Sequence, residues 1–195
     1  MVITRKKLNE INERYGQHAS WAIWNPDDIL DTSLIDRNVR DLRTDVVMVG
    51  LNVSADVSGR SWRNFHMGKN DPRLRLAFNE SPLRGAYMTD VLKDVVISKA
   101  TNVRRMIRAG AIDAAEHARE FAIEMSSIGA DTSTTFLVFG CDAQWVYTKY
   151  LASTFPDFIN CEHFGCYRTT ADWLLDLWLN IDSNSNISPT STLDR

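Results

Sequence analysis

Short, mainly apolar stretches constrain this chain more than any other feature of its sequence. Residues 46–51 form a continuous apolar run, residues 86–92 and 135–140 also read as strands although the first of them contains Thr89 and Asp90, and residues 158–163 form a weaker one. Such runs are typical of parallel strands that are buried on both faces of a sheet. The segments between them favour helices, as expected when helices connect parallel strands. The pattern predicts an α/β fold: a three-layer α/β/α sandwich around a central, mostly parallel four-stranded sheet.

Helical spacing of apolar residues marks the connecting segments. Leu8, Ile11 and Tyr15 share one face of a helix that Gly16 ends, and Gly129 closes a later one. Further helices are expected at about 101–109 and 111–127, after an N-cap at Asp142, and after Thr169 or Thr170. We expect the aromatic stretch 20–26 to be irregular and the polar, basic stretch 52–84 to be a long functional loop.

The length of 195 residues fits one domain, which we place at residues 1–181. The remainder, 182–195, is rich in Ser, Asn and Thr, and we expect a disordered tail. No apolar run reaches the ~18–20 residues that span a bilayer, and the N-terminus lacks the apolar core of a signal peptide. We therefore expect a cytoplasmic protein without membrane contact, with a monomer favoured. Three cysteines do not make a disulfide framework.

The charge is unevenly distributed along the chain. Residues 60–108 hold eleven Lys and Arg against four Asp and Glu, whereas the remainder holds eleven against 21. One basic face on an acidic body is the footprint of a polyanion binder, although chance scatter of surface charge gives the same count.

Four polar residues stand at or near the ends of the expected strands: Asn52, Asp90, Cys141 and His163. In open α/β sheets, ligands bind beyond the carboxyl ends of the parallel strands. These residues are therefore expected to meet at one site. The alternative for each is structural, because Asn52 is a common loop cap and His163 can be a buried, satisfied histidine.

Four segments resemble motifs of the uracil-DNA glycosylase superfamily, in the family's order, between Val46 and Trp178. Gly50-Leu51-Asn52-Val53-Ser54 resembles its first motif, which in two branches reads Gly, an apolar residue, Asn, Pro and Gly. The stretch Tyr87-Met88-Thr89-Asp90-Val91-Leu92-Lys93 resembles the base-recognition strand Tyr-Ile-Thr-Asn-Val-Val-Lys. Phe139-Gly140-Cys141-Asp142-Ala143 is similar to a Leu-Gly-x-x-Ala turn. His163-Phe164-Gly165 stands where a second catalytic motif begins with His-Pro-Ser.

The resemblance implies a role for each matching position. Asn52 would orient the attacking water and His163 would donate to the base, while Gly50, Leu51, Phe65 and Asp90 would hold the flipped base. DNA is the implied partner, and the residues expected to contact it are Arg60, Arg63, Lys69, Tyr167 and Arg168. No cofactor or metal is expected. An all-cysteine iron–sulfur site needs more than three cysteines, and the alternative is a zinc set of Cys141, Cys161, His163 and Cys166.

Departures from the motifs leave the activity open. Val53 replaces proline, and Phe164-Gly165 replaces Pro-Ser. Asp90 replaces the recognition asparagine, and an ionised carboxylate only accepts hydrogen bonds. Either Asp90 is protonated, or the preferred base offers a donor such as an exocyclic amine, or uracil is not the substrate. The alternatives to a glycosylase are a non-catalytic protein that binds nucleic acid or nucleotides and a hydrolase of free nucleosides or nucleotides.

Overall fold

The apolar runs form one mixed sheet in a computed structural model, which describes residues 3–53, 59 and 61–184. The order across this sheet is β1-β3-β2-β4-β5. The strands are β1 (Ala19–Trp21), β2 (Arg43–Asn52), β3 (Ala86–Leu92), β4 (Thr135–Phe139) and β5 (Phe158–Cys161). The last four run parallel to their neighbours, and β1 pairs antiparallel with β3. The α/β class is confirmed, but the expected four strands are five, because β1 lies in the stretch we expected to be irregular.

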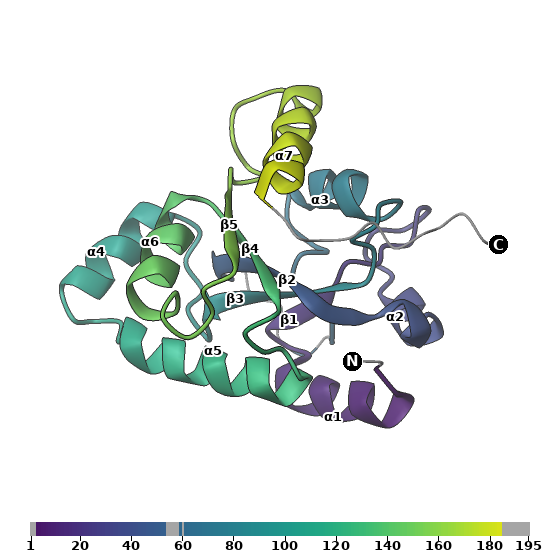
Figure 1. The fold of residues 1–195 in the computed structure, drawn as a ribbon, viewed down its shortest axis with the longest axis horizontal. Helices are drawn as coiled ribbons and strands as arrows, with labels where there is room; N and C mark the ends of the chain where they lie inside the picture. The colour runs from purple at the N-terminus through teal and green to yellow at the C-terminus, as the bar shows by residue number, and fades with distance from the viewer. Residues whose placement is uncertain (1–2, 54–58, 60, 185–195) are drawn as a thin grey trace.

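Helices cover both faces of this sheet (Figure 1). They are α1 (Arg5–Tyr15), α2 (Ser33–Arg37), α3 (Asp71–Phe78), α4 (Ala100–Arg108), α5 (Ala114–Ile128), α6 (Cys141–Tyr150) and α7 (Thr170–Asn184), with a 3-10 turn, η1 (Val39–Asp41). Figure 1 shows α1 and α5 on one side of the sheet and α3 and α7 on the other. In the described residues, no helix combines the length and the apolar character that crossing a membrane requires.

Local signals in the sequence explain where several helices begin and end. The Thr4 side chain accepts from the backbone N–H of Lys7 at the start of α1, and Asp113 accepts from two N–H groups at the start of α5. Gly129 ends α5 with φ of 81°, a left-handed conformation that favours glycine. Thr169 accepts from the N–H of Asp172 and begins α7 as one of its two predicted caps. Each cap satisfies backbone groups that the helix itself leaves without partners.

Alternate residues of the strands supply two hydrophobic cores, one on each face of the sheet. Phe136 and Val138 of β4 join a cluster with α1, α5 and α6, whereas Leu137 and Phe139 join a cluster with α3 and α7. The strands are therefore buried on both faces, which is why they read as continuous apolar runs rather than as an alternation.

Three boundaries differ from those expected. The stretch 52–84 contains a helix, α3, so it is not a continuous loop. Helix α6 begins at Cys141 after Gly140, so Asp142 lies in its first turn instead of at its cap. Helix α7 continues to Asn184, past the expected start of the tail, and residues 185–195 lie outside the described residues.

Candidate functional site

The carboxyl ends of β2, β3 and β4 and the segment after β5 border one cavity of about 390 Å³. Asn52, Phe65, Asp90 and His163, which the sequence placed at a common site, all line it. So do Gly50, Leu51, Arg63 and Lys69. Parallel strands bring their carboxyl ends to the same edge of a sheet, so residues far apart in sequence converge there.

Gly50 and Asp90 are direct partners in the register of β2 and β3. A Cβ at Gly50 would lie 2.2 Å from Asp90 Oδ1 and 3.4 Å from Phe65 Cε1. Real non-bonded atoms do not approach to 2.2 Å, so the carboxylate and the aromatic ring fit here because position 50 has no side chain. The glycine thus makes room for both groups in the cavity wall.

Asp90 is a buried carboxylate, only 3% exposed. Its Oδ2 accepts a hydrogen bond of 2.8 Å from Asn64 Nδ2, which also donates to the backbone oxygen of His18. Burial raises the pKa of Asp90 to about 6, against the opposing effects of Asn64 and the Lys93 charge. Asp90 is therefore mainly ionised at pH 7 and takes up a proton in mildly acidic solution.

Lys93 lies behind Asp90 in a buried polar network on the opposite face of the sheet. Its ammonium group donates to the backbone oxygen of Asp90 at 2.6 Å and lies 2.5 Å from Glu124 Oε2. The hydroxyl groups of Tyr87 and Thr89 both donate to Glu124 Oε1. Glu124 Oε1 accepts these two hydrogen bonds and Oε2 faces the Lys93 ammonium, so both oxygens of the buried carboxylate have polar neighbours. The network fixes the strand that carries Asp90.

The side chain of Asn52 is held by its amide nitrogen. Nδ2 lies 2.8–2.9 Å from the backbone oxygens of Val53, Val95 and Ile97. Because all three neighbours are carbonyl oxygens, this atom is the amide nitrogen, and its N–H groups are already used in hydrogen bonds. Only the Oδ1 acceptor of Asn52 can therefore serve a ligand or a water molecule.

His163 follows β5 and packs against Gly140, whose φ is +89° and whose added Cβ would lie 3.1 Å from the ring. The ring stacks on Phe164 with centroids 4.3 Å apart. Its Nδ1 accepts from the N–H of Gly165 at 2.9 Å. Although part of the residue stays exposed, the surrounding protein lowers the His163 pKa by desolvation. The ring is therefore neutral at pH 7 and carries its proton on Nε2, as a donor.

Phe65 belongs to a segment with an unusual backbone. Trp62 and Phe65 have φ of 61° and 66°, in the left-handed region that side chains rarely adopt. Surrounding contacts hold this conformation: Asn64 Oδ1 accepts from the N–H of Phe65, and Trp24 Nε1 donates to its carbonyl. Backbone strain of this kind is concentrated at binding and catalytic sites.

Asp71 is a second carboxylate in the cavity wall, and the sequence did not single it out. It is 6% exposed, and its Oδ2 accepts from the N–H of Gly68 at 2.6 Å. Burial raises its pKa, and its charge also raises the pKa of Asp90. The signal that could have found it is Asp71-Pro72, since proline is common in the first turn of a helix.

Only some of the residues expected to contact DNA lie at the cavity. Arg63 and Lys69 line the cavity, and Arg63 Nη1 is buried without a hydrogen-bond partner among the described residues. Tyr167 is fully exposed. Arg168 forms ion pairs with Glu162 and Asp176, away from the cavity. Arg60 lies outside the described residues.

The alternative zinc set is not assembled. Cys141 is exposed, Cys161 is buried and its thiol donates to the carbonyl of Ile159, and Cys166 is half-buried. Among residues 3–53, 59 and 61–184, no three His, Cys, Asp or Glu side chains are arranged to hold a metal ion.

The chain matches no protein-family model, no curated protein and no solved structure.

Proposed function

We propose that this chain is a DNA glycosylase-like protein that hydrolyses the N-glycosidic bond of a base flipped into the cavity. The observation that carries the proposal is that Asn52, Phe65, Asp90 and His163 line one cavity of about 390 Å³. These are the residues that the resemblance to the uracil-DNA glycosylase superfamily selects. On this proposal, β2 to β5 are the parallel core of that superfamily's α/β/α sandwich, and β1 is an addition.

The reaction breaks the bond between the sugar C1′ and a nitrogen of the base. The electron pair leaves with the base, and the oxygen of a water molecule forms the new bond to C1′. One proton of that water is released to the leaving base or to solvent. The protein has to position the water and to stabilise negative charge on the departing base.

Asn52 positions the water in this mechanism. Its amide nitrogen is fixed by three backbone carbonyls, so Oδ1 has a defined place in the cavity wall. A carboxamide is too weak a base to deprotonate water, but it orients a water molecule that attacks a cationic sugar.

His163 stabilises the leaving base. Its proton is on Nε2 because Nδ1 accepts from Gly165. A donor aimed at a base oxygen strengthens its hydrogen bond as charge develops there, and one such donor is typically worth ~3–4 kcal/mol in other enzymes.

Asp90 and Phe65 recognise the base. Phe65 supplies an aromatic face beside Gly50, and Asp90 supplies an acceptor edge that is ionised at neutral pH. An acceptor edge suits a base that presents N–H donors, such as an exocyclic amine, better than it suits the O4 atom of uracil. We therefore propose an amino-bearing base as the preferred substrate at neutral pH.

The second candidate is a protein that binds nucleic acid or nucleotides through the same cavity without hydrolysis. The fixed amide of Asn52 favours it, because three backbone contacts explain this residue without any water. The two candidates share the base pocket and differ only in turnover.

A gel assay for abasic sites separates the candidates. Labelled oligonucleotides carrying uracil, hypoxanthine, xanthine, mismatched thymine or amino-bearing cytosine and adenine analogues are incubated with the protein and then cleaved with alkali. We expect cleavage of an amino-bearing substrate, its loss in Asn52→Ala and His163→Ala, and its retention in Asn9→Ala on the exposed surface of α1. Binding without cleavage of any substrate by the wild-type protein would leave only the second candidate.

A further inference from the structure

The paired helices α4 and α6 carry a basic surface beyond the cavity, and Trp145 lies among three of its cations. We call this the α4–α6 surface, and its cations are Lys99, Arg104, Arg105, Arg108 and Lys149. Helix α4 packs on α6. The segments 99–108 and 141–150 contain these five cations and one carboxylate, Asp142, in a chain whose net charge is −3. The surface is therefore strongly positive on a protein that is otherwise acidic.

The Trp145 ring organises three of these cations. The Arg104 guanidinium lies 5.1 Å from the ring centroid, the Arg108 guanidinium 5.8 Å, and the Lys149 ammonium 5.7 Å. Cations over an aromatic face are attracted to it at these distances. The ring thus orders long side chains that would otherwise lose conformational entropy when they bind a ligand.

The α4–α6 surface begins at the wall of the cavity. Arg104 forms an ion pair of 2.7 Å with Asp142, and Asp142 lines the cavity in the first turn of α6. Ser98, next to Lys99, lines the cavity as well. A ligand that leaves the cavity past these residues meets the basic side chains directly.

We propose that the α4–α6 surface binds the phosphates of the DNA strand that carries the flipped base. The proposal rests on the proposed function for the identity of this strand. The charge of the surface matches a polyanion, and its ordered guanidinium groups match phosphate oxygens. The partner is the sugar–phosphate backbone rather than stacked bases, because the cations already lie against the indole ring.

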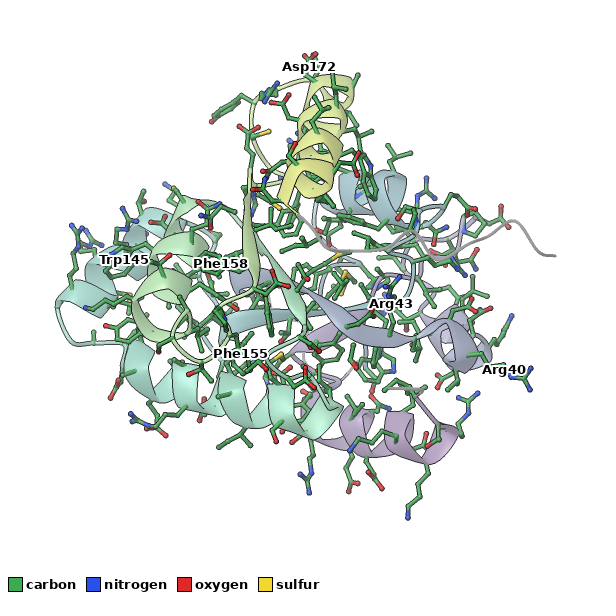
Figure 2. All side chains as sticks on the ribbon, in the orientation of Figure 1. Arg40, Arg43, Trp145, Phe155, Phe158 and Asp172 are labelled. Carbon is green, nitrogen blue, oxygen red and sulfur yellow. The ribbon has the colours of Figure 1, made fainter. Side chains whose placement is uncertain are left out.

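The test compares two triple variants with equal changes in charge. Arg105→Ala/Arg108→Ala/Lys149→Ala removes three exposed cations of the α4–α6 surface. Lys6→Ala/Arg37→Ala/Arg40→Ala removes three exposed cations elsewhere. Figure 2 shows Arg40 at the opposite end of the molecule from Trp145. The dissociation constant of a fluorescent single-stranded oligonucleotide is measured as a function of NaCl concentration, and thermal unfolding checks that each variant is folded.

We expect the α4–α6 variant to bind more weakly and to reduce the slope of log Kd against log[NaCl] by about 2, at ~0.7 for each lost phosphate contact. The Lys6/Arg37/Arg40 variant should keep the wild-type slope. The proposal would be overturned if the slope of log Kd against log[NaCl] were equal in all three proteins, or if both variants reduced this slope equally. Absence of binding by the wild-type protein at low salt would also overturn it. Absence of base excision would instead contradict the proposed function, because the binding slopes are measured without turnover.

Discussion

The carboxylate of Asp90 occupies the space that a side chain at Gly50 would fill, since a Cβ built there would lie 2.2 Å from Asp90 Oδ1. The two residues are register partners on neighbouring parallel strands, so neither backbone can move away without disturbing the sheet. The shape of the base-binding wall therefore depends on the absence of a side chain at position 50.

Gly50→Ala should displace the Asp90 carboxylate and destabilise the protein by about 1–3 kcal/mol, as overpacking of a well-packed site usually does. Chemical denaturation measures this loss. Asp90→Ala in the same chain removes the clashing oxygen, so the double variant should recover part of the stability. Additive losses in the double variant would show that the two residues do not interact.

Asp90→Asn should stabilise the protein at pH 7 by about 1–3 kcal/mol. The pKa of Asp90 is about 6 in the folded protein, against an ordinary value of 3.8. The folded state therefore binds more protons than the unfolded state between about pH 4 and 6, and wild-type stability falls as the pH rises through this range. The variant has no such group, so its advantage should disappear near pH 4, as denaturation across that range would reveal.

The same substitution should also change base preference. Asparagine can donate to O4 of uracil and accept from its N3–H, whereas the ionised carboxylate only accepts. We expect Asp90→Asn to increase binding or excision of uracil relative to an amino-bearing base. In the wild-type protein, acidification below pH 6 should shift preference in the same direction, because the protonated acid becomes a donor. An unchanged ratio in both experiments would remove Asp90 from base recognition.

His66 should make stability rise with pH, which is the opposite of the dependence that Asp90 gives. The side chain is fully buried, and burial lowers its pKa to about 4 from an ordinary 6.5. The unfolded state binds more protons between these values, so this contribution is complete above pH 6.5 and is lost as the pH falls to 4. We expect a loss of about 3 kcal/mol, which is absent in His66→Leu and clearest in an Asp90→Asn background. If the stability of the wild-type protein and that of His66→Leu changed equally with pH, this prediction would be wrong.

Arg73 should position the loop that follows His163. From α3, its guanidinium lies 2.7–3.3 Å from the backbone oxygens of Phe164, Cys166 and Arg168. Arg73→Ala removes these contacts and should cost about 1–2 kcal/mol. It should also reduce excision or base binding through a displaced His163.

Arg75 is the matched control for this prediction, because it lies on the same helix and donates to a single carbonyl, that of Pro26. Arg75→Ala should leave base binding unchanged. If both variants lose base binding equally, the effect comes from α3 in general and not from the loop.

The parallel strands could be predicted because burial on both faces leaves a direct trace, the continuous apolar run. The antiparallel strand β1 could not, since three residues are too few to show a period, and it forms only where β3 offers a partner. Helix α3 was also missed: it begins among polar residues, and Arg73 and Arg75 flank Leu74, one of the apolar side chains that it buries.

The residues of the cavity also divide into those that the local sequence indicates and those that only the tertiary structure brings to its wall. Asn52, Asp90 and His163 could be selected because the ends of parallel strands must meet. The Asp71-Pro72 pair could have indicated the start of a helix, but not a place in the cavity wall, which depends on how residues 63–71 fold over the sheet. The ion pairs of Arg168 with Glu162 and Asp176 were equally hidden, since Asp176 comes from α7.

The antiparallel strand β1 has a consequence for acid strength. By pairing with residues 87–89 of β3, it turns the strand that carries Asp90 from an edge strand into an interior strand of the sheet. His18, just before β1, also accepts the hydrogen bond that orients Asn64 toward Asp90. Loosening the N-terminal segment should hydrate the Asp90 carboxyl group and lower its pKa toward 3.8, and loss of the Asn64 hydrogen bond should oppose part of that change. A segment far upstream in the sequence thus influences the protonation state of Asp90 through Asn64.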